Sequence, residues 1–154
     1  MKIGKLKLRR LQPSVIPVMH GDSELLVYNS LWRGRIHTSF YASTAQFLIQ
    51  SDRPKPTSRQ TIFVESILSY SRSIREEIES RVTKFVANVP DLNLAPPSEV
   101  VKNLCEPIVV IPMDAEIVLP TVEFLFMLPL DDGVRSIDVR INNWNVKNVL
   151  LDAG

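Results

Sequence analysis

Two histidines and a nearby carboxylate are the residues of this chain that could together hold a metal ion. His20 stands in the stretch MHGD, two positions before Asp22, and His37 lies further along the chain. Two imidazoles and one carboxylate form a ligand set suited to iron or zinc. Neither histidine has a second His or Cys at a short metal-ligand spacing, so the set forms only if the first strand pairs beside the strand of His37. A small hydrolase or metal-dependent enzyme using His20, Asp22 and His37 is therefore the alternative interpretation of this chain.

The remaining reactive groups are dispersed along the sequence. Cys105 is the only cysteine, and it follows Leu104 at the end of a predicted short helix, a setting typical of an inert buried thiol. Asp131 and Asp132 precede Gly133, and acidic residues in such a turn usually cap and bend the chain. The five glycines are too widely spaced for a nucleotide-binding loop. We therefore predict no catalytic residue, no cofactor and no enzyme activity.

The stretch LWRGRIHTSFY, residues 31–41, gathers the side-chain types that most often anchor protein interfaces. Trp, Tyr and Arg bury a large area at a small entropic cost and still form hydrogen bonds. The candidate contact residues are Trp32, Arg33, Arg35, His37 and Tyr41. The competing interpretation of the same residues is ordinary strand packing beside a solvated turn.

Short-period apolar patterning across residues 24–50 predicts three strands in a meander. Gly34 and its two flanking arginines are expected to form the first turn, because glycine tolerates a positive φ. Beyond that turn, strand alternation places Ile36 on the inward face, and Arg35 and His37 on the outward face. Strand alternation alone therefore explains the pattern of these residues, and a catalytic role is not required to explain it.

A long helix is predicted over residues 58–87. Thr57 and Gln60 have the spacing of a capping box at its start. Apolar residues recur along one side at helical intervals, and oppositely charged residues stand four apart on the other side. The apolar stripe consists of Phe63, Ile67, Ile74, Ile78, Val82 and Phe85, and the charged pairs are Arg72 with Glu76, Arg75 with Glu79, and Glu77 with Arg81. Serines are weaker helix formers, so the serines within residues 69–73 predict a bend or a break there.

The last third of the chain returns to strands after a short helix that begins at Ser98. Segments 108–112 and 122–128 are apolar at successive positions, which predicts central strands covered on both faces. Residues 136–141 alternate between apolar and polar, which predicts a strand with one inward face. Strands, a long helix, a short helix and further strands, without βαβ alternation, predict an α+β fold. We expect a largely antiparallel sheet with both helices packed on one face.

The net charge and its distribution limit the kinds of partner that the sequence predicts. A formal net charge of +1 gives no reason to expect nucleic acid or an anionic membrane as partner. Five basic residues nevertheless precede the first acid, so residues 1–10 form a basic arm. We interpret this arm as an edge strand with Leu6 and Leu8 facing inward, since Lys on an edge discourages unwanted pairing. An anion-binding patch is the alternative interpretation.

The length of the chain indicates how many domains it forms, and its cysteine content indicates the cellular compartment. A chain of 154 residues is an ordinary size for one domain, so residues 1–154 are treated as a single domain. No run approaches the roughly 18 apolar residues of a membrane span. A single cysteine permits no intrachain disulfide, which agrees with a reducing compartment such as the cytoplasm. The sequence does not determine an oligomeric state.

Four segments between residues 31 and 153 share hydrophobic patterns with a known type of domain. They are LWRGRI, PTSRQ at the start of the long helix, SEVVKNLCEPIVVIP, and EFLFMLPLDDGVRSIDVRINNWNVKNVLL. In these patterns the chain resembles small bacterial domains of unknown function, some of whose relatives resemble toxin-immunity proteins. Such families often have Glu-His-Gly before the penultimate strand, where this chain has Asp131, Asp132 and Gly133. The resemblance carries no catalytic residue across and implies a non-catalytic, cytosolic, immunity-like protein that docks onto another protein, through the edge and turns of the meander.

Overall fold

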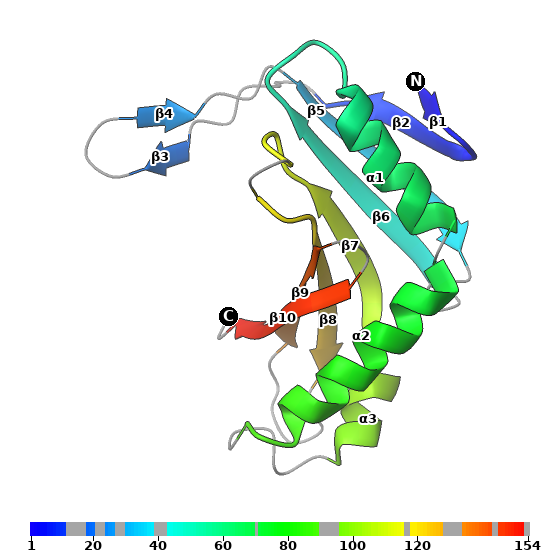
Figure 1. The fold of residues 1–154 in the computed structure, drawn as a ribbon, viewed down its shortest axis with the longest axis vertical. Coiled ribbons are helices and arrows are strands. Elements are labelled where there is room, and N and C mark those ends of the chain that lie inside the picture. Colours follow the sequence, from blue (N-terminus) through cyan, green and yellow to red (C-terminus); the bar gives the residue numbers. More distant parts are fainter. Residues whose placement is uncertain are drawn as a thin grey trace.

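A computed structural model of the chain contains one large mixed sheet with helices against one face, and a separate pair of strands (Figure 1). The α+β class predicted from the sequence is thereby confirmed. The structure describes residues 1–11, 18–20, 24–26, 30–38, 43–69, 71–89, 96–115, 118–127, 134–142 and 145–152.

The large sheet has the strand order β1-β2-β5-β6-β7-β8-β9-β10. Its strands are β1 (Lys2–Ile3), β2 (Leu6–Arg10), β5 (Ser30–Thr38), β6 (Ser43–Ser51), β7 (Cys105–Ile111), β8 (Thr121–Met127), β9 (Val134–Asn142) and β10 (Asn145–Asp152). The second sheet consists of β3 (Val18–His20) and β4 (Glu24–Leu26), which project to the left of the large sheet in Figure 1. The helices are α1 (Ser58–Ser69), α2 (Ser71–Val86) and α3 (Pro97–Lys102).

Neighbouring strands of the large sheet are antiparallel, with the exception of β6 and β7, which pair in parallel. Parallel neighbours require a crossover connection, and here the segment that contains all three helices makes it. This segment returns the chain to the end of the sheet at which β6 began. The sheet is therefore mixed, a feature that the expectation of a largely antiparallel sheet did not include.

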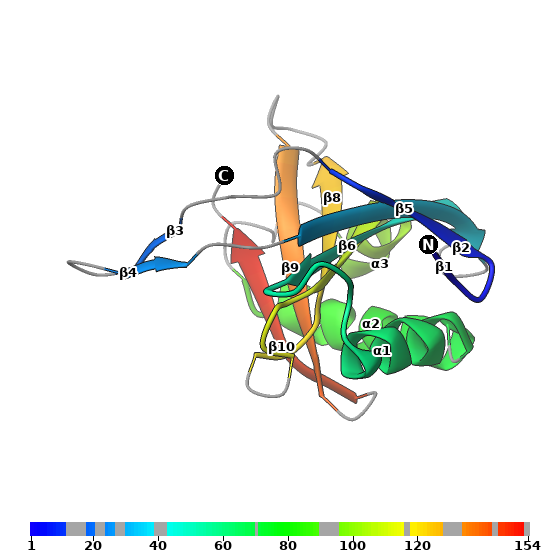
Figure 2. The same ribbon diagram turned by 90° about the horizontal axis from the view of Figure 1, so that it is seen from above.

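The core lies between the large sheet and the helices. One row of directly paired residues crosses seven strands on the helix-covered side: Leu8, Gly34, Phe47, Val109, Val122, Val139 and Val149. The two longer helices contribute the buried residues Val64, Ile67, Ile74, Ile78, Val82 and Val86. Figure 2 shows these helices on the same side of the sheet. Each fully buried aliphatic side chain stabilises the fold by about 1.5–3 kcal/mol, so this layer is the main source of stability.

The described helices cover the apolar strands of the C-terminal half on one face only. In β7, Val109 and Ile111 are buried, whereas Ile108 and Val110 are half-buried on the other side. In β8, Phe124 is buried and its outward neighbour is the polar residue at position 123. The prediction of central strands covered on both faces is wrong, because the described helices lie together on one side of the sheet (Figure 2).

The basic residues at the start of the chain form a hairpin at one edge of the large sheet. β1 pairs with β2, and Gly4 in the intervening turn has a φ of 57°. Leu6 and Leu8 are buried, and the lysine between them is exposed. The predicted inward orientation of Leu6 and Leu8 is confirmed, with β1 as the outermost strand.

β5 runs without interruption through residues 33–35, so the turn predicted at these residues is wrong. Gly34 lies in the middle of the strand and pairs with Leu8 of β2. A Cβ atom at position 34 would lie 2.6 Å from the carbonyl oxygen of Lys7. The close approach of β2, rather than a positive φ, therefore explains the glycine.

Helix α1 begins with the predicted capping box. The backbone N–H of Thr57 donates to Gln60 Oε1 at 2.9 Å, and the backbone N–H of Gln60 donates to Thr57 Oγ1 at 3.2 Å. Gln60 is buried, and its Nε2 donates to the carbonyl oxygens of Gln50 and, at 2.9 Å, of Pro112. This single side chain therefore joins the start of α1 to the ends of β6 and β7.

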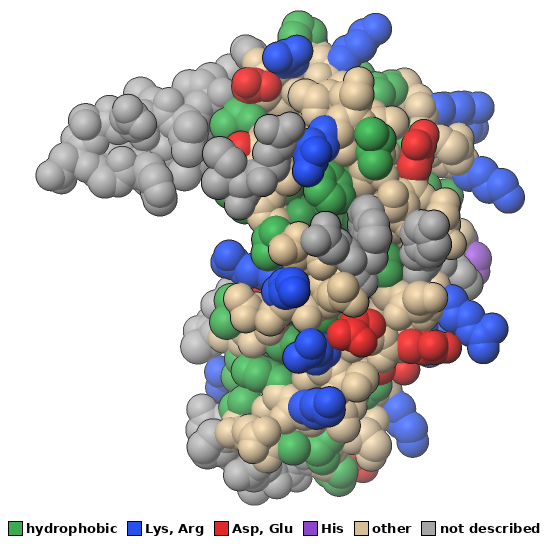
Figure 3. Space-filling model, in the orientation of Figure 1, with side chains coloured by type: hydrophobic (Ala, Val, Ile, Leu, Met, Phe, Trp, Pro, Cys, Tyr) green, Lys and Arg blue, Asp and Glu red, His purple; other side chains and the backbone are tan. Residues whose placement is uncertain are grey.

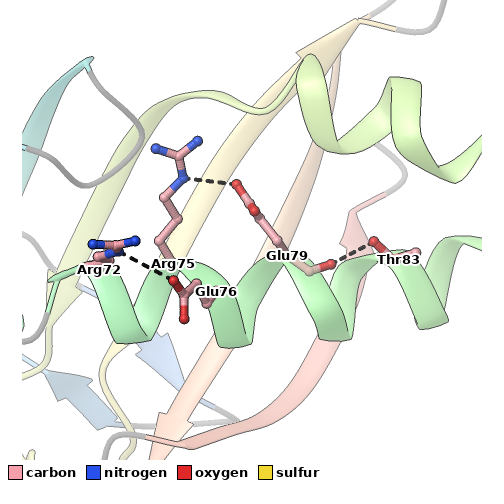
Figure 4. A network of polar contacts seen from close by, with 5 residues as sticks. All are labelled: Arg72, Arg75, Glu76, Glu79 and Thr83. Carbon is pink, nitrogen blue, oxygen red and sulfur yellow. Dashed lines mark hydrogen bonds and ion pairs between the residues drawn. The ribbon is translucent and has the colours of Figure 1, made fainter.

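The exposed side of α2 carries the three predicted ion pairs. Their N–O distances are 3.4 Å for Arg72 with Glu76, 2.9 Å for Arg75 with Glu79, and 3.3 Å for Arg81 with Glu77. Figure 4 shows the first two pairs, together with the hydrogen bond that Thr83 Oγ1 donates to the carbonyl oxygen of Glu79 at 2.7 Å. Such pairs contribute only about 0.2–0.5 kcal/mol each, so they mark a solvated helix face.

Two helices occupy the segment for which one long helix was predicted. α1 ends at Ser69 and α2 begins at Ser71, within the stretch in which a bend or break was expected. Tyr70 lies outside the described residues. The two helices point in different directions in Figure 1, and α1 contacts β1 and β7 whereas α2 contacts β10. A membrane-spanning helix, long and apolar enough to cross a bilayer, is absent from the described part of the chain.

Candidate functional site

The structure does not bring the candidate metal ligands together. His20 pairs with Glu24 in the two-stranded sheet, whereas His37 lies near the end of β5 and pairs with Thr44. The strand beside β5 is β2 rather than β3, and β3 lies far from the arrowhead of β5 in Figure 1. Asp22 is outside the described residues. Among the residues that the structure describes, no group of three or more His, Cys, Asp or Glu side chains could hold a metal ion.

Alternation along β5 separates the predicted contact residues onto two faces. Trp32 packs against the core, and its buried Nε1–H has no acceptor among the described residues. Arg33, Arg35 and His37 lie on the other face, where Arg33 is half-buried and the other two side chains are exposed. Tyr41 is outside the described residues. Three of the predicted contact residues therefore share one surface, and Trp32 belongs to the packing.

The side of β2, β5, β6 and β7 that faces away from the described helices forms one continuous surface, named the open face. Its residues are Lys7, Arg9, Arg33, Arg35, His37, Thr44, Gln46, Leu48, Ile108 and Val110. One row of directly paired residues on it runs through Arg9, Arg33, Leu48 and Val110, and the adjacent row runs through Arg35, Gln46 and Ile108. Strand pairing, rather than proximity in sequence, therefore builds this surface.

The open face is basic at the end formed by β2 and β5. The residues of β1, β2, β5 and β6 include no Asp or Glu, and their basic members are Lys2, Lys7, Arg9, Arg10, Arg33 and Arg35. Arg9 is directly opposite Arg33, a position in which like charges destabilise a sheet. No ion pair joins Lys7, Arg9, Arg33 or Arg35 to another described residue. Within the described part of the chain, these four cations therefore have no counter-charge in contact.

The acidic side chains that the structure describes on the same side of β8 and β9 lie too far away to neutralise this end. Glu123 of β8 pairs with Ile108 of β7 and with Asp138 of β9. Three strand spacings separate Arg35 from Glu123, or roughly 14 Å between backbones. Glu123 and Asp138 each take part in another interaction within the chain. Among the described side chains, the cations of β2 and β5 therefore lie apart from the carboxylates of β8 and β9.

Aliphatic side chains occupy the part of the open face formed by β6 and β7. Leu48, Ile108 and Val110 are each half-buried. No Phe, Tyr or Trp side chain is described on this face, because Trp32 and Phe47 belong to the core side, and His37 is its one described aromatic ring. An apolar centre bordered by arginine is typical of protein interfaces, whereas single-stranded nucleic acid is usually held by stacked aromatic side chains. The composition of the open face therefore favours a protein partner.

A small cavity opens on this face beside Arg35. Its volume is about 190 Å³, and it is lined by Arg35, Thr44, Gln46, Pro107 and Ile108. Within the described part of the chain, no side-chain hydrogen bond or ion pair engages Arg35, Thr44 or Gln46. Three polar side chains therefore line one cavity, and none of them forms a hydrogen bond with another described residue.

A larger groove of about 820 Å³ lies between α2 and α3 on the helix-covered side. Its walls include Arg75 and Glu79, which are paired with each other, together with Lys84 and Lys102. Figure 3 shows blue and red side chains interspersed over the lower half of this side, where α2 lies. The arginine of this groove is already paired with Glu79, whereas Arg35 of the smaller cavity has no ion-pair partner among the described residues.

Comparison of the chain with models of protein families, with curated proteins and with solved structures finds no match. The open face is therefore characterised by its own residues. Of these, sequence analysis assigned Arg9 to a separate basic arm and missed Gln46 and Ile108. Gln46 had a usable signal, since it alternates with buried positions of β6. No signal in the sequence indicated that Arg9 pairs with Arg33, because that pairing depends on which strand lies beside β5.

Proposed function

We propose that this chain is a non-catalytic binding protein that docks an acidic surface of another protein onto its open face. The observation that carries the proposal is the Arg9–Arg33 pair, in which like charges stand directly opposite each other without an ion-pair partner among the described residues. An acidic partner would relieve this repulsion and accept charge-assisted hydrogen bonds from both guanidinium groups.

The centre of the open face adds apolar contact to this charge complementarity. Leu48, Ile108 and Val110 are half-buried in the free chain, so a partner could remove their remaining surface from water. Arginine at the border fixes the orientation of the partner and accelerates the encounter, while the apolar centre contributes to the lifetime of the complex. The two kinds of contact together support a specific interface rather than a diffuse attraction.

A docking role agrees with the resemblance of residues 31–153 to small bacterial domains that have immunity-like relatives. In this proposal the chain acts in the cytoplasm, which fits the presence of one free cysteine, Cys105. Cys105 is exposed at the start of β7, so the expectation of a buried thiol at a helix end is wrong. The alternative of a metal-dependent or hydrolytic enzyme has less support, because His20 and His37 lie in different sheets.

The test compares two charge-reversal variants that change the net charge by the same amount. Arg9→Glu with Arg33→Glu alters the open face, and Lys84→Glu with Lys102→Glu alters the α2–α3 groove as the matched control. Binding of an acetylated and amidated decaglutamate peptide is measured by isothermal titration calorimetry at low salt. We expect the first variant to bind about tenfold more weakly than the unmodified chain, and the control to stay within about twofold of it.

Two outcomes would overturn this proposal. Loss of binding in the Lys84 and Lys102 variant, with the Arg9 and Arg33 variant unaffected, would locate the acidic ligand in the α2–α3 groove. Tighter binding of a single-stranded oligonucleotide of matched charge, dependent on Arg9 and Arg33, would make the open face a nucleic-acid site.

A further inference from the structure

We infer that the cavity beside Arg35 is a receptor for one glutamate side chain of the docked partner. This inference rests on the proposed function and deepens it, because it names the residue type that the acidic partner must present. The cavity lies on the open face, next to the row that contains Arg9 and Arg33. A partner seated on these arginines would therefore bring an acidic side chain to its entrance.

The volume of the cavity selects a single side chain. Pockets for drug-sized ligands usually measure about 300–1,000 Å³, whereas a cavity of about 150 Å³ can accept a benzene molecule. At about 190 Å³, the hollow beside Arg35 accommodates one side chain and is too small for a nucleotide.

The polar wall of the cavity selects a carboxylate. Arg35 pairs directly with Gln46, and Thr44 stands two positions from Gln46 on the same side of β6, so the three side chains form one cluster. A guanidinium group can donate two parallel hydrogen bonds to a carboxylate, and the hydroxyl and amide groups can each donate another. None of the described residues that line the cavity is acidic, so Arg35 would repel a lysine or arginine side chain.

The apolar wall of the cavity distinguishes glutamate from shorter or fully polar anions. Pro107 and Ile108 line this wall, where the methylene groups of a bound side chain would pack. Glutamate has two methylene groups, aspartate has one and inorganic phosphate has none. Burying one further methylene group corresponds to roughly a fourfold gain in affinity.

The strand framework keeps the cavity open and rigid. Its lining residues come from three adjacent paired strands, β5, β6 and β7. The pairing of β7 with β8 shifts register between Cys105 and Ile108, so Pro107 lies within an irregularity of the strand. Such bulges redirect side chains that would otherwise continue a regular row. A site formed in this way is organised before the ligand arrives, which lowers the entropic cost of binding.

The experiment compares hexaglutamate and hexaaspartate peptides, both acetylated and amidated and equal in charge. Arg35→Lys keeps the charge but removes the paired donors, and Ile108→Ala removes part of the apolar wall. Arg140→Lys is the control, because Arg140 is exposed on β9, two strands beyond the open face on the same side of the sheet. The affinity of each peptide is measured by calorimetry, and the side-chain Nε–Hε signal of Arg35 is followed by NMR.

The unmodified chain and Arg140→Lys should prefer hexaglutamate by roughly fourfold. Ile108→Ala should lose this preference while its affinity for hexaaspartate is kept. Arg35→Lys should bind both peptides roughly three- to tenfold more weakly, an effect that simple charge attraction would not produce. Thermal melts of all variants establish that each is folded, and the Arg35 variant tests the inference independently of any packing change caused by Ile108→Ala.

The outcomes separate this inference from the function on which it rests. Equal affinity for both peptides that still depends on Arg9 and Arg33 would refute the glutamate receptor and leave the docking surface intact. Binding that is indifferent to Arg9 and Arg33 would refute both. A larger change of the Arg35 signal with inorganic phosphate than with hexaglutamate would also refute the assignment, because it would identify the cavity as a phosphate site.

Discussion

Arg9 and Arg33 stand directly opposite each other, where an oppositely charged pair would stabilise the sheet. Nothing in the packing requires two cations there, because Arg9 is exposed and Arg33 is half-buried on the uncovered side. When a residue lowers the stability of the fold but serves binding, its replacement is expected to raise the stability and weaken the binding. The Arg9–Arg33 pair therefore allows the two properties to be tested together.

Arg9→Glu is predicted to stabilise the fold and weaken binding at once. An opposite-charge pair across two strands contributes about 0.2–1 kcal/mol to the free energy of unfolding, and added salt should reduce this gain. Urea denaturation measures the stability, and calorimetry with decaglutamate measures the binding. The double variant Arg9→Glu with Arg33→Glu restores like charges and should lose the gain. A single variant that is less stable than the unmodified chain at low salt would contradict this account of the pair.

Substitution of Trp32 is predicted to lower stability, whereas substitution of Arg35 is predicted to weaken binding. Trp32→Ala removes a large side chain packed against the core and should lower the free energy of unfolding by about 3 kcal/mol. Arg35→Ala removes an exposed side chain and should melt like the unmodified chain while binding acidic peptides more weakly. Thermal melts and peptide titrations on the two variants distinguish these roles. Reduced stability in Arg35→Ala would show that Arg35 has a structural role instead.

At the scale of elements, local interactions were predictable and strand pairing was not. The capping box at Thr57 and the i, i+4 ion pairs of α2 depend on residues within one turn of each other, so their spacing in sequence determines them. The turn expected at Gly34 was wrong because the reason for that glycine lies in β2, outside its own segment. The parallel pairing of β6 with β7 likewise depends on the long helical crossover between them.

Gln60 is predicted to matter more than an ordinary capping residue. Gln60→Leu should lower the free energy of unfolding by about 2–4 kcal/mol, because it leaves the carbonyl oxygens of Gln50 and Pro112 without this donor. Thr57→Ala, which removes only the helix cap, should cost about 1 kcal/mol. Urea denaturation of the two variants measures the difference. Equal losses would mean that Gln60 acts only as a cap and does not join α1 to the sheet.

In the whole fold, the described helices lie on one side of the sheet, and the proposed partner would bind the other side (Figure 2). The open face combines residues from the start of the chain, from the β5–β6 hairpin and from β7 after the helical segment. Sequence analysis named Arg33, Arg35 and His37, because arginine and aromatic clusters are recognisable locally. The sequence did not show that they share a surface with Arg9, Gln46 and Ile108, because this depends on the strand order of the folded chain.

The most direct test of this account is an NMR titration of the isotopically labelled chain with the decaglutamate peptide, following every assigned amide and arginine side-chain signal. The account predicts that the largest changes fall on the outward residues of β2, β5, β6 and β7, with Arg33 and Arg35 among them, while the signals of α2 and α3 stay unchanged. Changes concentrated on Lys84, Lys102 and the rest of the α2–α3 groove, with the open face unaffected, would contradict it.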